Sequence, residues 1–431
     1  DLDVLGEDVE TTFFDLNEVI NGNDNDTIVL DKDYTFNPTS DMDFVDGVAI
    51  DRAVTIIGNG HIIDSAKQSR MFNIRADNVV IRNITFINAA KTDASGAVRL
   101  VGDNGVISDC IFVNNAAKGA GGLFWDGRHG TVSDCVFMNN VANQEGGAIT
   151  WFGDYGKVTG CIFINNTAND GAAIWLGSSN GNISSNIFVN NSGNYGTIYY
   201  DNYYTRQLSV NNNIFLNDEG VPIYFAHNDD SNVDYNWFGN NATDYDMAPA
   251  TINVVMDNWL FLNATAYPAS ISVSESSDIL FKLYSYGASG VSDYDDSKLS
   301  VVNLTVTANN GDVDESIIAL GDSVEFTPNG AGDASVTAAV ENAEYTVVLD
   351  VAKAVSVLSG DDLVMAYRDG SAWAVALNDE DGNGIAGKVV KIGININGLD
   401  KVYSFVTDVN GVAGLPINLI SGTYAINATF E

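Results

Sequence analysis

Asp-Cys-Ile-Phe-Val-Asn-Asn at residues 109–115 is the stretch that decides the fold, because the chain repeats nearly the same seven residues five more times. The copies begin at residues 134, 160, 185, 212 and 235, so their phenylalanines follow one another at steps of 25, 26, 25, 27 and 23 residues. A looser copy places Phe86 one step of 26 residues upstream. A repeat of this length is typical of stacked units that cannot bury their apolar faces alone, so it predicts a solenoid.

Each repeat contains short extended segments and no helical period. Small and β-branched residues fill the segments, while Gly and Asn mark the corners. Two or three strands of about 4–5 residues, rising roughly 3.3 Å per residue, fit one coil of a parallel β-helix. The leucine ladder of a leucine-rich repeat is missing. We therefore predict an all-β fold that begins with a right-handed parallel β-helix, a solenoid like that of pectate lyases.

Stacked coils place equivalent residues about 4.8 Å apart, which turns each recurring residue into a ladder. The phenylalanines are predicted to form an internal aromatic stack: Phe112, Phe137, Phe163, Phe188, Phe215 and Phe238. Two residues after them stands a column of asparagines: Asn114, Asn139, Asn165 and Asn190. We expect each amide to bond the same amide of the next coil, and each backbone to turn a corner in the left-handed conformation.

The three cysteines, Cys110, Cys135 and Cys161, share one ladder position on consecutive coils. A free cysteine behaves as a small buried apolar residue, so we expect three reduced thiols in the core. A disulfide between adjacent coils is the alternative, and it would leave one thiol unpaired. Metal ligation by a cysteine column without histidine is disfavoured.

The composition is strongly acidic, with 19 Lys plus Arg against 57 Asp plus Glu and a formal net charge of −38. A surface of this charge repels nucleic acid and anionic membranes, so neither is expected as a partner. No run of 18 apolar residues is present, so no direct membrane insertion is expected in this segment. The chain begins at Asp1 without Met, and we expect a mature or trimmed extracellular protein.

Three structural regions are expected along the chain. Residues 1–257 are assigned to the β-helix, with an N-terminal helix near 11–21 that caps the open sheet end. From residue 258 the repeat disappears, and alternating segments with hairpin signals follow. We expect two Ig-like β-sandwich domains, at 258–352 and 353–431.

Parallel β-helices often carry polysaccharide lyases and glycoside hydrolases, which need converging carboxylates or a base beside carboxylates. The only local cluster of this kind is Asp126 with Arg128 and His129, one coil before Asp154. Exposed loop charges are the simpler interpretation, so no catalytic residue is assigned. No cofactor is expected either, and calcium is the one candidate. Asp379 to Gly384 imitates the start of a calcium loop, but Val390 stands where the bidentate Glu belongs, so a tight turn is favoured and no metal ligand is assigned.

Aromatic residues recur about once per coil and are the candidates for contact with a ligand. Flat rows of aromatic side chains stack on sugar rings, but they also serve as internal ladders. Alternation along the sequence does not show which of the two applies, because each corner of the coil changes which residues face inward. With the loop charges, the candidate ligand-binding residues are Trp125, Asp126, Arg128, Trp151, Asp154, Tyr155, Trp175, Tyr203 and Tyr204.

Gly146-Gly-Ala-Ile149, with Phe-x-x-Asn as in Phe137 and Asn140, resembles the repeats of chlamydial polymorphic outer-membrane proteins. The whole chain resembles methanogen adhesin-like surface proteins, which join such a β-helix to bacterial Ig-like repeats. The segments that carry this likeness are Val54–Asp64, Tyr235–Asn241, Asp408–Ala413 and Gly422–Tyr424. The resemblance implies an extracellular adhesin and carries over no catalytic residue.

We therefore expect a cell-surface adhesin that binds glycans or proteins of other cells, with the β-helix as the binding region and the Ig-like domains as a stalk. Two alternatives stay open. One is a polysaccharide lyase or glycoside hydrolase on the β-helix, and the other is a cell-wall or S-layer-like component that binds no ligand.

Overall fold

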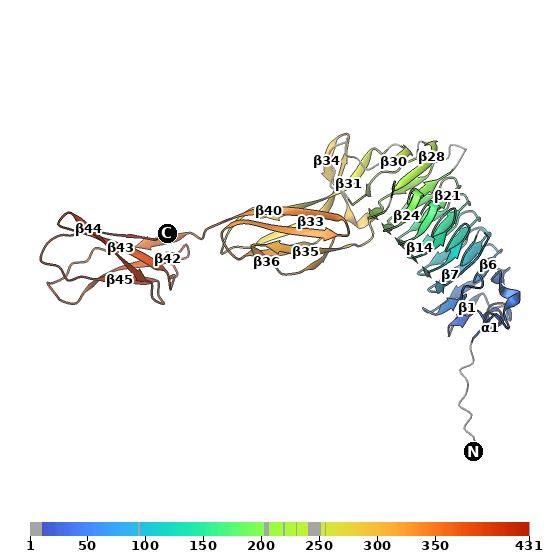
Figure 1. Cartoon of the computed structure of the whole chain (residues 1–431), viewed down its shortest axis with the longest axis horizontal. Coiled ribbons are helices and arrows are strands. Elements are labelled where there is room, and N and C mark those ends of the chain that lie inside the picture. The colour runs from blue at the N-terminus through green and yellow to red at the C-terminus, as the bar shows by residue number, and fades with distance from the viewer. Residues whose placement is uncertain are drawn as a thin grey trace, which may run out of the picture.

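A computed structural model describes residues 11–430 except 94, 202–206, 219, 230, 240–250 and 255. It shows an all-β protein with a right-handed β-helix at the N-terminal side and two later sandwiches (Figure 1). The sandwiches are compatible with Ig-like domains.

Helix α1 (Phe13–Asn21) covers the first coil of the β-helix, as predicted (Figure 1). Thr12 and Asp15 form a reciprocal capping box at its N-terminus, and Gly22 follows its last residue. Phe13, Leu16 and Ile20 are buried against the coil below. The helix therefore shields the apolar interior at the end of the stack. A short 3₁₀ helix, η1 (Met42–Phe44), follows within the first coils.

Three parallel sheets run along the β-helix, each with one short strand per coil. Sheet 1 holds β1 (Thr27–Val29), β4 (Thr55–Ile57), β7 (Val80–Arg82), β10 (Val106–Ser108), β14 (Thr131–Ser133), β18 (Lys157–Thr159), β22 (Asn182–Ser184) and β26 (Ser209–Asn211). Sheet 2 begins with β2 (Tyr34–Thr35), β5 (Ile62–Asp64), β8 (Thr85–Ile87), β11 (Ile111–Val113), β15 (Val136–Met138), β19 (Ile162–Ile164), β23 (Ile187–Val189), β27 (Ile214–Leu216) and β29 (Asn236–Trp237).

Sheet 3 lies on the remaining side of each coil. Its strands are β3 (Val48–Ile50), β6 (Phe72–Ile74), β9 (Val98–Leu100), β13 (Leu123–Trp125), β17 (Ile149–Trp151), β21 (Ile174–Leu176), β25 (Ile198–Tyr200), β28 (Ile223–Asp229) and β30 (Thr251–Val254). A smaller corner sheet leads into it, with β12 (Ala116–Ala117), β16 (Val141–Ala142), β20 (Thr167–Asp170) and β24 (Ser192–Tyr195).

The phenylalanine repeat forms the predicted internal stack. Phe112 pairs in register with Phe137, and the next rungs continue to Phe163, Phe188 and Phe215. Their rings, with those of Phe86 and Phe238, lie 4.7–5.1 Å apart between centroids. This column is the centre of the core.

The cysteines lie on one ladder as reduced, fully buried thiols. Burial raises the pKa of Cys110 and Cys135 well above the ordinary value. The ladder continues as asparagine: the backbone N–H of Cys161 donates to Asn186 Oδ1 over 2.9 Å, and Asn186 Nδ2 donates to Asn213 Oδ1 over 3.0 Å. The three thiols donate to the carbonyls of Ser108, Ser133 and Thr159, so the cysteines occupy a core position that asparagine fills in the later coils.

The asparagine prediction was right for the corner and wrong for the amide ladder. Asn114, Asn139, Asn165 and Asn190 have φ between 52° and 56°, but their side chains are exposed. The buried amide ladder lies one residue later. Asn115 Nδ2 donates to Asn140 Oδ1, Asn140 Nδ2 to Asn166 Oδ1 and Asn166 Nδ2 to Asn191 Oδ1, each over 3.0 Å. The left-handed residue turns the chain, so the following side chain points inward.

The middle sandwich shares a sheet with the β-helix, and the expected boundary at residue 258 falls within that sheet. Sheet 2 continues from β29 into β31 (Asn258–Tyr267), β33 (Ser277–Gly287), β38 (Ser323–Pro328) and β36 (Gly311–Val313), with β34 (Gly290–Asp293) paired to β33. The opposing sheet holds β32 (Ser270–Ser272), β40 (Ala343–Ala352), β39 (Gly332–Val340), β35 (Asn303–Asn309) and β37 (Ile317–Ala319).

The middle sandwich also packs on the outer face of sheet 2. Ile187, Ile214 and Leu216 belong to the same apolar cluster as the sandwich core. Tyr294 Oη donates to Asn212 Oδ1 over 2.7 Å, and Ser185 Oγ donates to the carbonyl of Lys298, in the 3₁₀ helix η3 (Asp296–Lys298), over 2.7 Å. The two parts are thus joined by a continuous sheet and a shared core.

The last sandwich follows an extended connection (Figure 1). One sheet holds β41 (Ser356–Ser359), β42 (Ala372–Asp379) and β45 (Val412–Pro416), and the other holds β44 (Leu399–Val406), β43 (Val389–Ile396) and β46 (Ile426–Thr429). Its core is small and separate from the others.

Candidate functional site

Sheet 3 presents two columns of large side chains on opposite faces. The register pairs Trp125 with Trp151, and then Leu176 with Tyr200, on the inner face. It pairs Phe124 with Thr150, Trp175, Tyr199 and Tyr224 on the outer face. Successive residues of a strand point to opposite sides, so adjacent aromatics in the sequence have opposite surroundings.

Trp125 and Trp151 are core residues, which corrects their assignment as ligand contacts. Their exposed fractions are 0% and 1%. The indoles stack 4.6 Å apart with an angle of 3° between their planes. Gly130 and Gly156 lie against these rings, and an added Cβ would come within 2.3 Å and 2.5 Å of them. Both tryptophans therefore stabilise the coil and do not meet a ligand.

The outer column carries an aromatic surface that we call the outer strip, which consists of Phe124, Phe152, Trp175, Tyr195, Tyr199 and Tyr224. The rings of Phe152 and Trp175 lie 4.9 Å apart, and those of Tyr199 and Tyr224 stack at 5.3 Å. Tyr195 packs edge-on against Tyr224 at 5.5 Å. Phe152 and Tyr195 are 39% and 45% exposed, so the strip reaches solvent.

Trp175 was predicted as a ligand contact, and the structure places it on the outer strip. It is only 6% exposed, because its indole lies flat against the coil over Gly177 and beside Phe152. An added Cβ at Gly177 would meet the ring at 2.8 Å. Trp175 thus forms the floor of the strip, while Phe152 and Tyr195 form its exposed parts.

Three carboxylates border the outer strip: Glu145, Asp170 and Asp201. Glu145 and Asp170 are bridge partners on neighbouring coils. Burial, and then repulsion between these carboxylates, raises the pKa of Glu145 and of Asp170. Burial and the nearby Asp201 and Asp170 charges also raise the pKa of Tyr199 to about 12.

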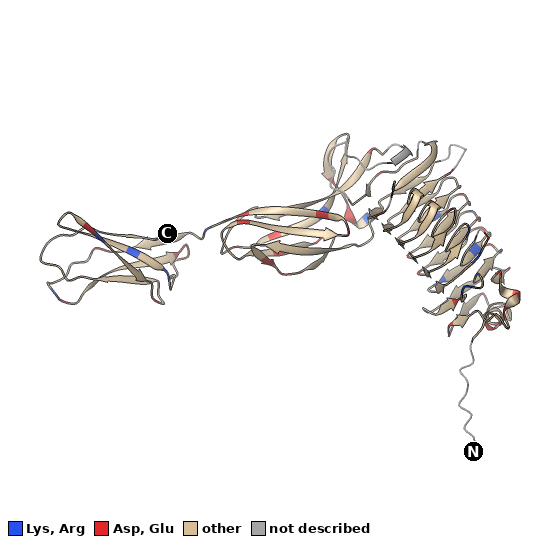
Figure 2. Ribbon diagram, viewed as in Figure 1, with Lys and Arg blue, Asp and Glu red and all other residues tan. Residues whose placement is uncertain are grey.

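Two basic residues, Lys118 and His227, bear on this border, and His227 adds a positive charge only when it is protonated. His227 Nε2 lies 3.8 Å from Asp201 Oδ1, with each side chain 44% exposed. The Lys118 charge acts on Glu145 and partly opposes the rise of its pKa. Figure 2 shows basic residues as isolated segments of the ribbon. The border therefore carries more negative than positive groups.

The predicted loop charges take part in hydrogen bonds between neighbouring coils. Asp154 Oδ1 accepts the backbone N–H of Ser179 over 2.9 Å, and the backbone N–H of Arg128 donates to Asp103 Oδ1 over 2.7 Å. Each interaction joins one coil to its neighbour and so supports the corner. The Arg128 side chain is exposed.

Two other predicted candidates lie near the strip or on the corner. Asp126 is exposed and directly follows β13. Phe152 and Asp201 directly follow β17 and β25 in the same way, so Asp126 lies on the edge of the strip that these two residues share. Tyr155 is 50% exposed and stacks on His129 at 4.9 Å on the corner loop. The remaining candidates, Tyr203 and Tyr204, lie outside the described residues.

The calcium-like segment at 379–384 is a hydrogen-bonded turn. Asp379 Oδ1 accepts from the backbone N–H of Asn383 over 2.7 Å, and Asp379 Oδ2 accepts from Asn383 Nδ2 over 3.1 Å. Val390 is fully buried in the sandwich. Within the described part of the chain, no group of three His, Cys, Asp or Glu side chains is placed to hold a metal ion.

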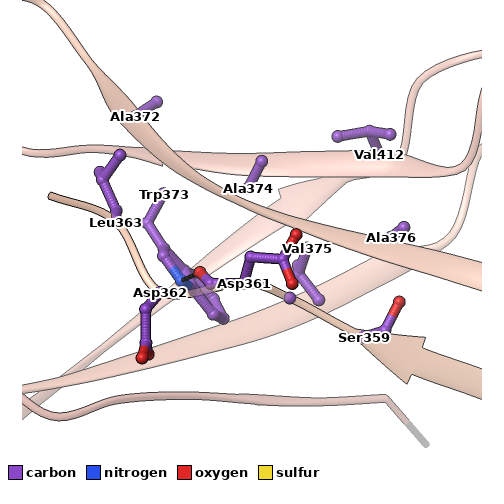
Figure 3. A pocket seen from close by; sticks show the side chains of 11 residues that line it. Ser359, Asp361, Asp362, Leu363, Ala372, Trp373, Ala374, Val375, Ala376 and Val412 are labelled. Atoms are coloured by element: carbon purple, nitrogen blue, oxygen red, sulfur yellow. Dashed lines mark hydrogen bonds between the residues drawn. The ribbon is translucent and has the colours of Figure 1, made fainter.

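A groove of about 360 Å³ opens on the last sandwich, beside β42 (Figure 3). Trp373 forms part of its lining and donates its Nε1–H to the carbonyl of Asp361 over 2.7 Å. Asp361, Asp362 and Leu363 lie beside the indole. The lining offers two carboxylates on a mostly small apolar surface, and it is less extended than the outer strip.

The sequence prediction missed Phe124, Phe152, Tyr195, Glu145, Asp170 and Asp201 as parts of one surface. The signal that identifies the surface is the inner column Leu123, Ile149, Ile174, Ile198 and Ile223, which fixes the register of sheet 3. When the coils are aligned on this column, Trp175 takes the outward-facing position that Phe124 has in its own strand. It does not take the inward-facing position of Trp151. Alignment on tryptophan mixes the two faces.

Comparison with known proteins supports the fold. Residues 71–242 match the family described as right handed beta helix region. The match covers the coils that carry the phenylalanine ladder. A search of curated proteins finds no relative. Right-handed β-helices occur in polysaccharide lyases and in proteins without catalytic activity, so this match shows the fold and not the ligand. Among the described residues, no helix is long and apolar enough to cross a membrane.

Proposed function

We propose that the protein is an extracellular cell-surface adhesin that binds glycans through the outer strip. The observation that carries this proposal is the contiguous column of aromatic side chains on the outer face of sheet 3. Aromatic faces stack on the apolar faces of sugar rings, and the bordering carboxylates accept hydrogen bonds from hydroxyl groups. Sheet 3 offers this surface while the middle sandwich packs on sheet 2.

The rest of the chain supports display of that surface. The continuous sheet and shared core hold the β-helix firmly on the middle sandwich, and the last sandwich extends the array (Figure 1). In this proposal the two sandwiches serve as a stalk, and many weak sugar contacts along neighbouring molecules provide strong attachment to other cells. The net charge of −38 argues against a nucleic-acid partner.

Removal of rings from the outer strip is expected to weaken glycan binding. The double variant Tyr195→Ala, Tyr199→Ala should lower affinity roughly thirtyfold, because each of the two stacked rings contributes on the order of 1 kcal/mol. A glycan array followed by calorimetry measures the change. Tyr155→Ala is the matched control, since Tyr155 is an exposed stacked tyrosine on the corner loop. Equal losses in both variants, or binding of no glycan by the native chain, would contradict the proposal and favour a structural wall component.

A polysaccharide-degrading activity is the second candidate, because Glu145 and Asp170 face each other across one coil step with raised pKa values. A carboxyl with a raised pKa is suited to act as a general acid. In that case, release of reducing ends or unsaturated sugars from a bound polysaccharide should fall at least about a hundredfold in Glu145→Gln, with binding retained. Asp126→Asn, at the edge of the strip, is the control. Binding without any product in the native chain excludes this candidate.

A further inference from the structure

The outer strip combines two properties whose joint effect selects among glycans. Its floor and walls are aromatic, and its border is formed by Glu145, Asp170 and Asp201. Glu145 and Asp170 are bridge partners on neighbouring coils, and the charge of Asp201 acts on both. The charges of Asp201 and Asp170 also act on Tyr199, so this group of carboxylates lies beside the tyrosine end of the strip. A ligand on these rings therefore lies within the field of all three.

The positive groups near this surface do not neutralise that field. Lys118 acts on Glu145, and His227 lies beside Asp201 at 3.8 Å. Arg99 lies further along the column, with its guanidinium carbon 5.9 Å from the centre of the Phe124 ring. At that end Asp126 and Arg99 carry opposite charges, so the end of the strip formed by Trp175, Tyr199 and Tyr224 is the more negative one. An anionic sugar is repelled there, whereas a cation is attracted.

Aromatic rings add to the preference for a cation. The face of a tyrosine or tryptophan ring carries partial negative charge and attracts an ammonium group. Tyr199 and Tyr224 stack with an angle of 15° between their planes, and Tyr195 meets them at the edge. The Tyr199 hydroxyl group remains protonated at neutral pH, because burial and the nearby Asp201 and Asp170 charges raise its pKa to about 12. These tyrosines therefore offer aromatic faces and hydroxyl groups to a ligand, and they carry no positive charge that would repel an ammonium group.

The strip is also extended along the axis of the β-helix. Its outer column crosses the strands β13, β17, β21, β25 and β28. Four steps of about 4.8 Å make a surface roughly 20 Å long, which suits an extended chain of several sugars better than a single one. A linear polymer laid along it meets the aromatic column and the carboxylate border together.

We propose that the outer strip selects cationic amino-sugar polymers, with free amines on the sugar rings, over uronate polymers and over the same polymers in acetylated form. This specificity rests on the proposed glycan-binding function. Sugar rings stack on Phe152 and the tyrosines, above the buried Trp175, and protonated amines pair with the carboxylates of Glu145, Asp170 and Asp201. The cationic polymer is the occupant that matches the charge of the border and the length of the strip.

The test compares three hexasaccharides with the full chain by calorimetry at low salt, at about pH 6 and again at about pH 7, because burial raises the pKa of Glu145 and Asp170 above the ordinary carboxyl value. The probes are a chitosan hexamer, its fully acetylated counterpart and an oligogalacturonate. We expect the chitosan hexamer to bind about tenfold more tightly than the acetylated hexamer, the factor that a few exposed ion pairs supply, and the oligogalacturonate to bind most weakly. Added salt should reduce this difference.

A triple variant and a matched control locate the effect. Glu145→Gln, Asp170→Asn, Asp201→Asn should remove the preference for the chitosan hexamer while binding of the acetylated hexamer is retained. The control Asp278→Asn, Glu315→Gln, Asp350→Asn removes the same number of charges from exposed positions of the middle sandwich. A preference that survives the first variant, or falls equally in the control, overturns the inference.

The outcomes also separate this inference from the proposed function. Equal binding of the two hexamers, or tighter binding of the oligogalacturonate, overturns the charge selection and leaves glycan binding intact. Failure of all three probes together with failure of a broad glycan array overturns both.

Discussion

Trp151→Ala is expected to lower the free energy of unfolding of the β-helix by about 3–5 kcal/mol, the range measured when a large aromatic residue is removed from a core. Trp151 is 1% exposed and stacks on Trp125 at 4.6 Å. Its Nε1–H donates to the carbonyl of Gly153 over 2.8 Å. Removal leaves a cavity between coils and an unpaired carbonyl, and neighbouring rings cannot close it because their positions are fixed by the ladder.

Phe152→Ala is the matched control for this variant. Phe152 is the next residue in the chain, but it points outward and is 39% exposed. Its removal should cost less than about 1.5 kcal/mol, since part of the ring already meets water and no closed cavity forms. Urea unfolding of the full chain, followed by circular dichroism, measures both changes. Equal costs for the two variants would show that Trp151 is not the internal member of the pair.

The contrast between Trp151 and Phe152 also shows why the solenoid was predictable and its surface was not. The phenylalanine ladder depends only on a period, and a period can be counted without knowing which way any side chain points. The outer strip depends on the facing of each residue. Trp125, Trp151 and Trp175 follow one another at intervals close to one coil, yet Trp175 stands one strand position earlier and therefore points outward.

The asparagine pair shows the same limit at a corner. Simple alternation from the inward Phe112 predicts that Asn114 also points inward. The backbone of Asn114 has φ of 56°, and this left-handed residue rotates the chain so that Asn115 enters the core instead. Both positions are asparagine, so the sequence does not show which residue turns the chain and which side chain forms the hydrogen bonds of the ladder. The conformation of the corner decides it.

No sequence motif identifies the carboxylates of the strip, for a related reason. Glu145, Asp170 and Asp201 stand more than 20 residues apart and share no common neighbours in the sequence. Only the register of the coils brings them around one group of rings. By contrast, Asp126 and Arg128 are close in the sequence and suggest a cluster, but the backbone N–H of Arg128 is bound to Asp103 of the preceding coil.

A second large effect is expected at Asp218, where the amide ladder ends. Asn191 donates its backbone N–H and its Nδ2 to Asp218 Oδ1 over 2.7 Å and 3.1 Å. Thr197 Oγ1 donates to Asp218 Oδ2 over 2.9 Å. Burial raises the pKa of Asp218 to about 7, although these hydrogen bonds act in the opposite direction. The rung therefore carries a carboxyl that is partly ionised at neutral pH.

The sign of the resulting pH dependence follows from the two states. The pKa of Asp218 in the folded chain lies above the ordinary value of 3.8, so the folded chain holds the proton more tightly than the unfolded chain. The stabilisation is complete below about pH 4 and is lost as the pH rises through about 7. A rise of this size corresponds to up to about 4 kcal/mol. The native β-helix should accordingly be less stable at pH 8 than at pH 5.

Asp218→Asn is expected to remove this dependence and to raise stability at pH 8. In the rungs below, Asn115, Asn140, Asn166 and Asn191 donate Nδ2 to the carbonyl of a phenylalanine on an earlier coil. By the same pattern, an amide at position 218 keeps the acceptor used by Asn191 and gains a donor directed at Phe188. No charge remains to be desolvated, so the variant should gain on the order of 2–4 kcal/mol at pH 8 and little at pH 5.

Urea unfolding at pH 5 and pH 8 measures this effect, with Asp109→Asn as control. Asp109 occupies an exposed corner with φ of 56°, where Asn is equally suited to the backbone. If Asp218→Asn and Asp109→Asn shift the unfolding midpoint alike, the gain comes from lower net charge and not from the ladder. If only Asp218→Asn flattens the pH dependence of stability, ionisation of Asp218 at the last rung is what destabilises the β-helix at high pH. An otherwise uniform amide ladder would then end in a group that weakens the coil as the pH rises.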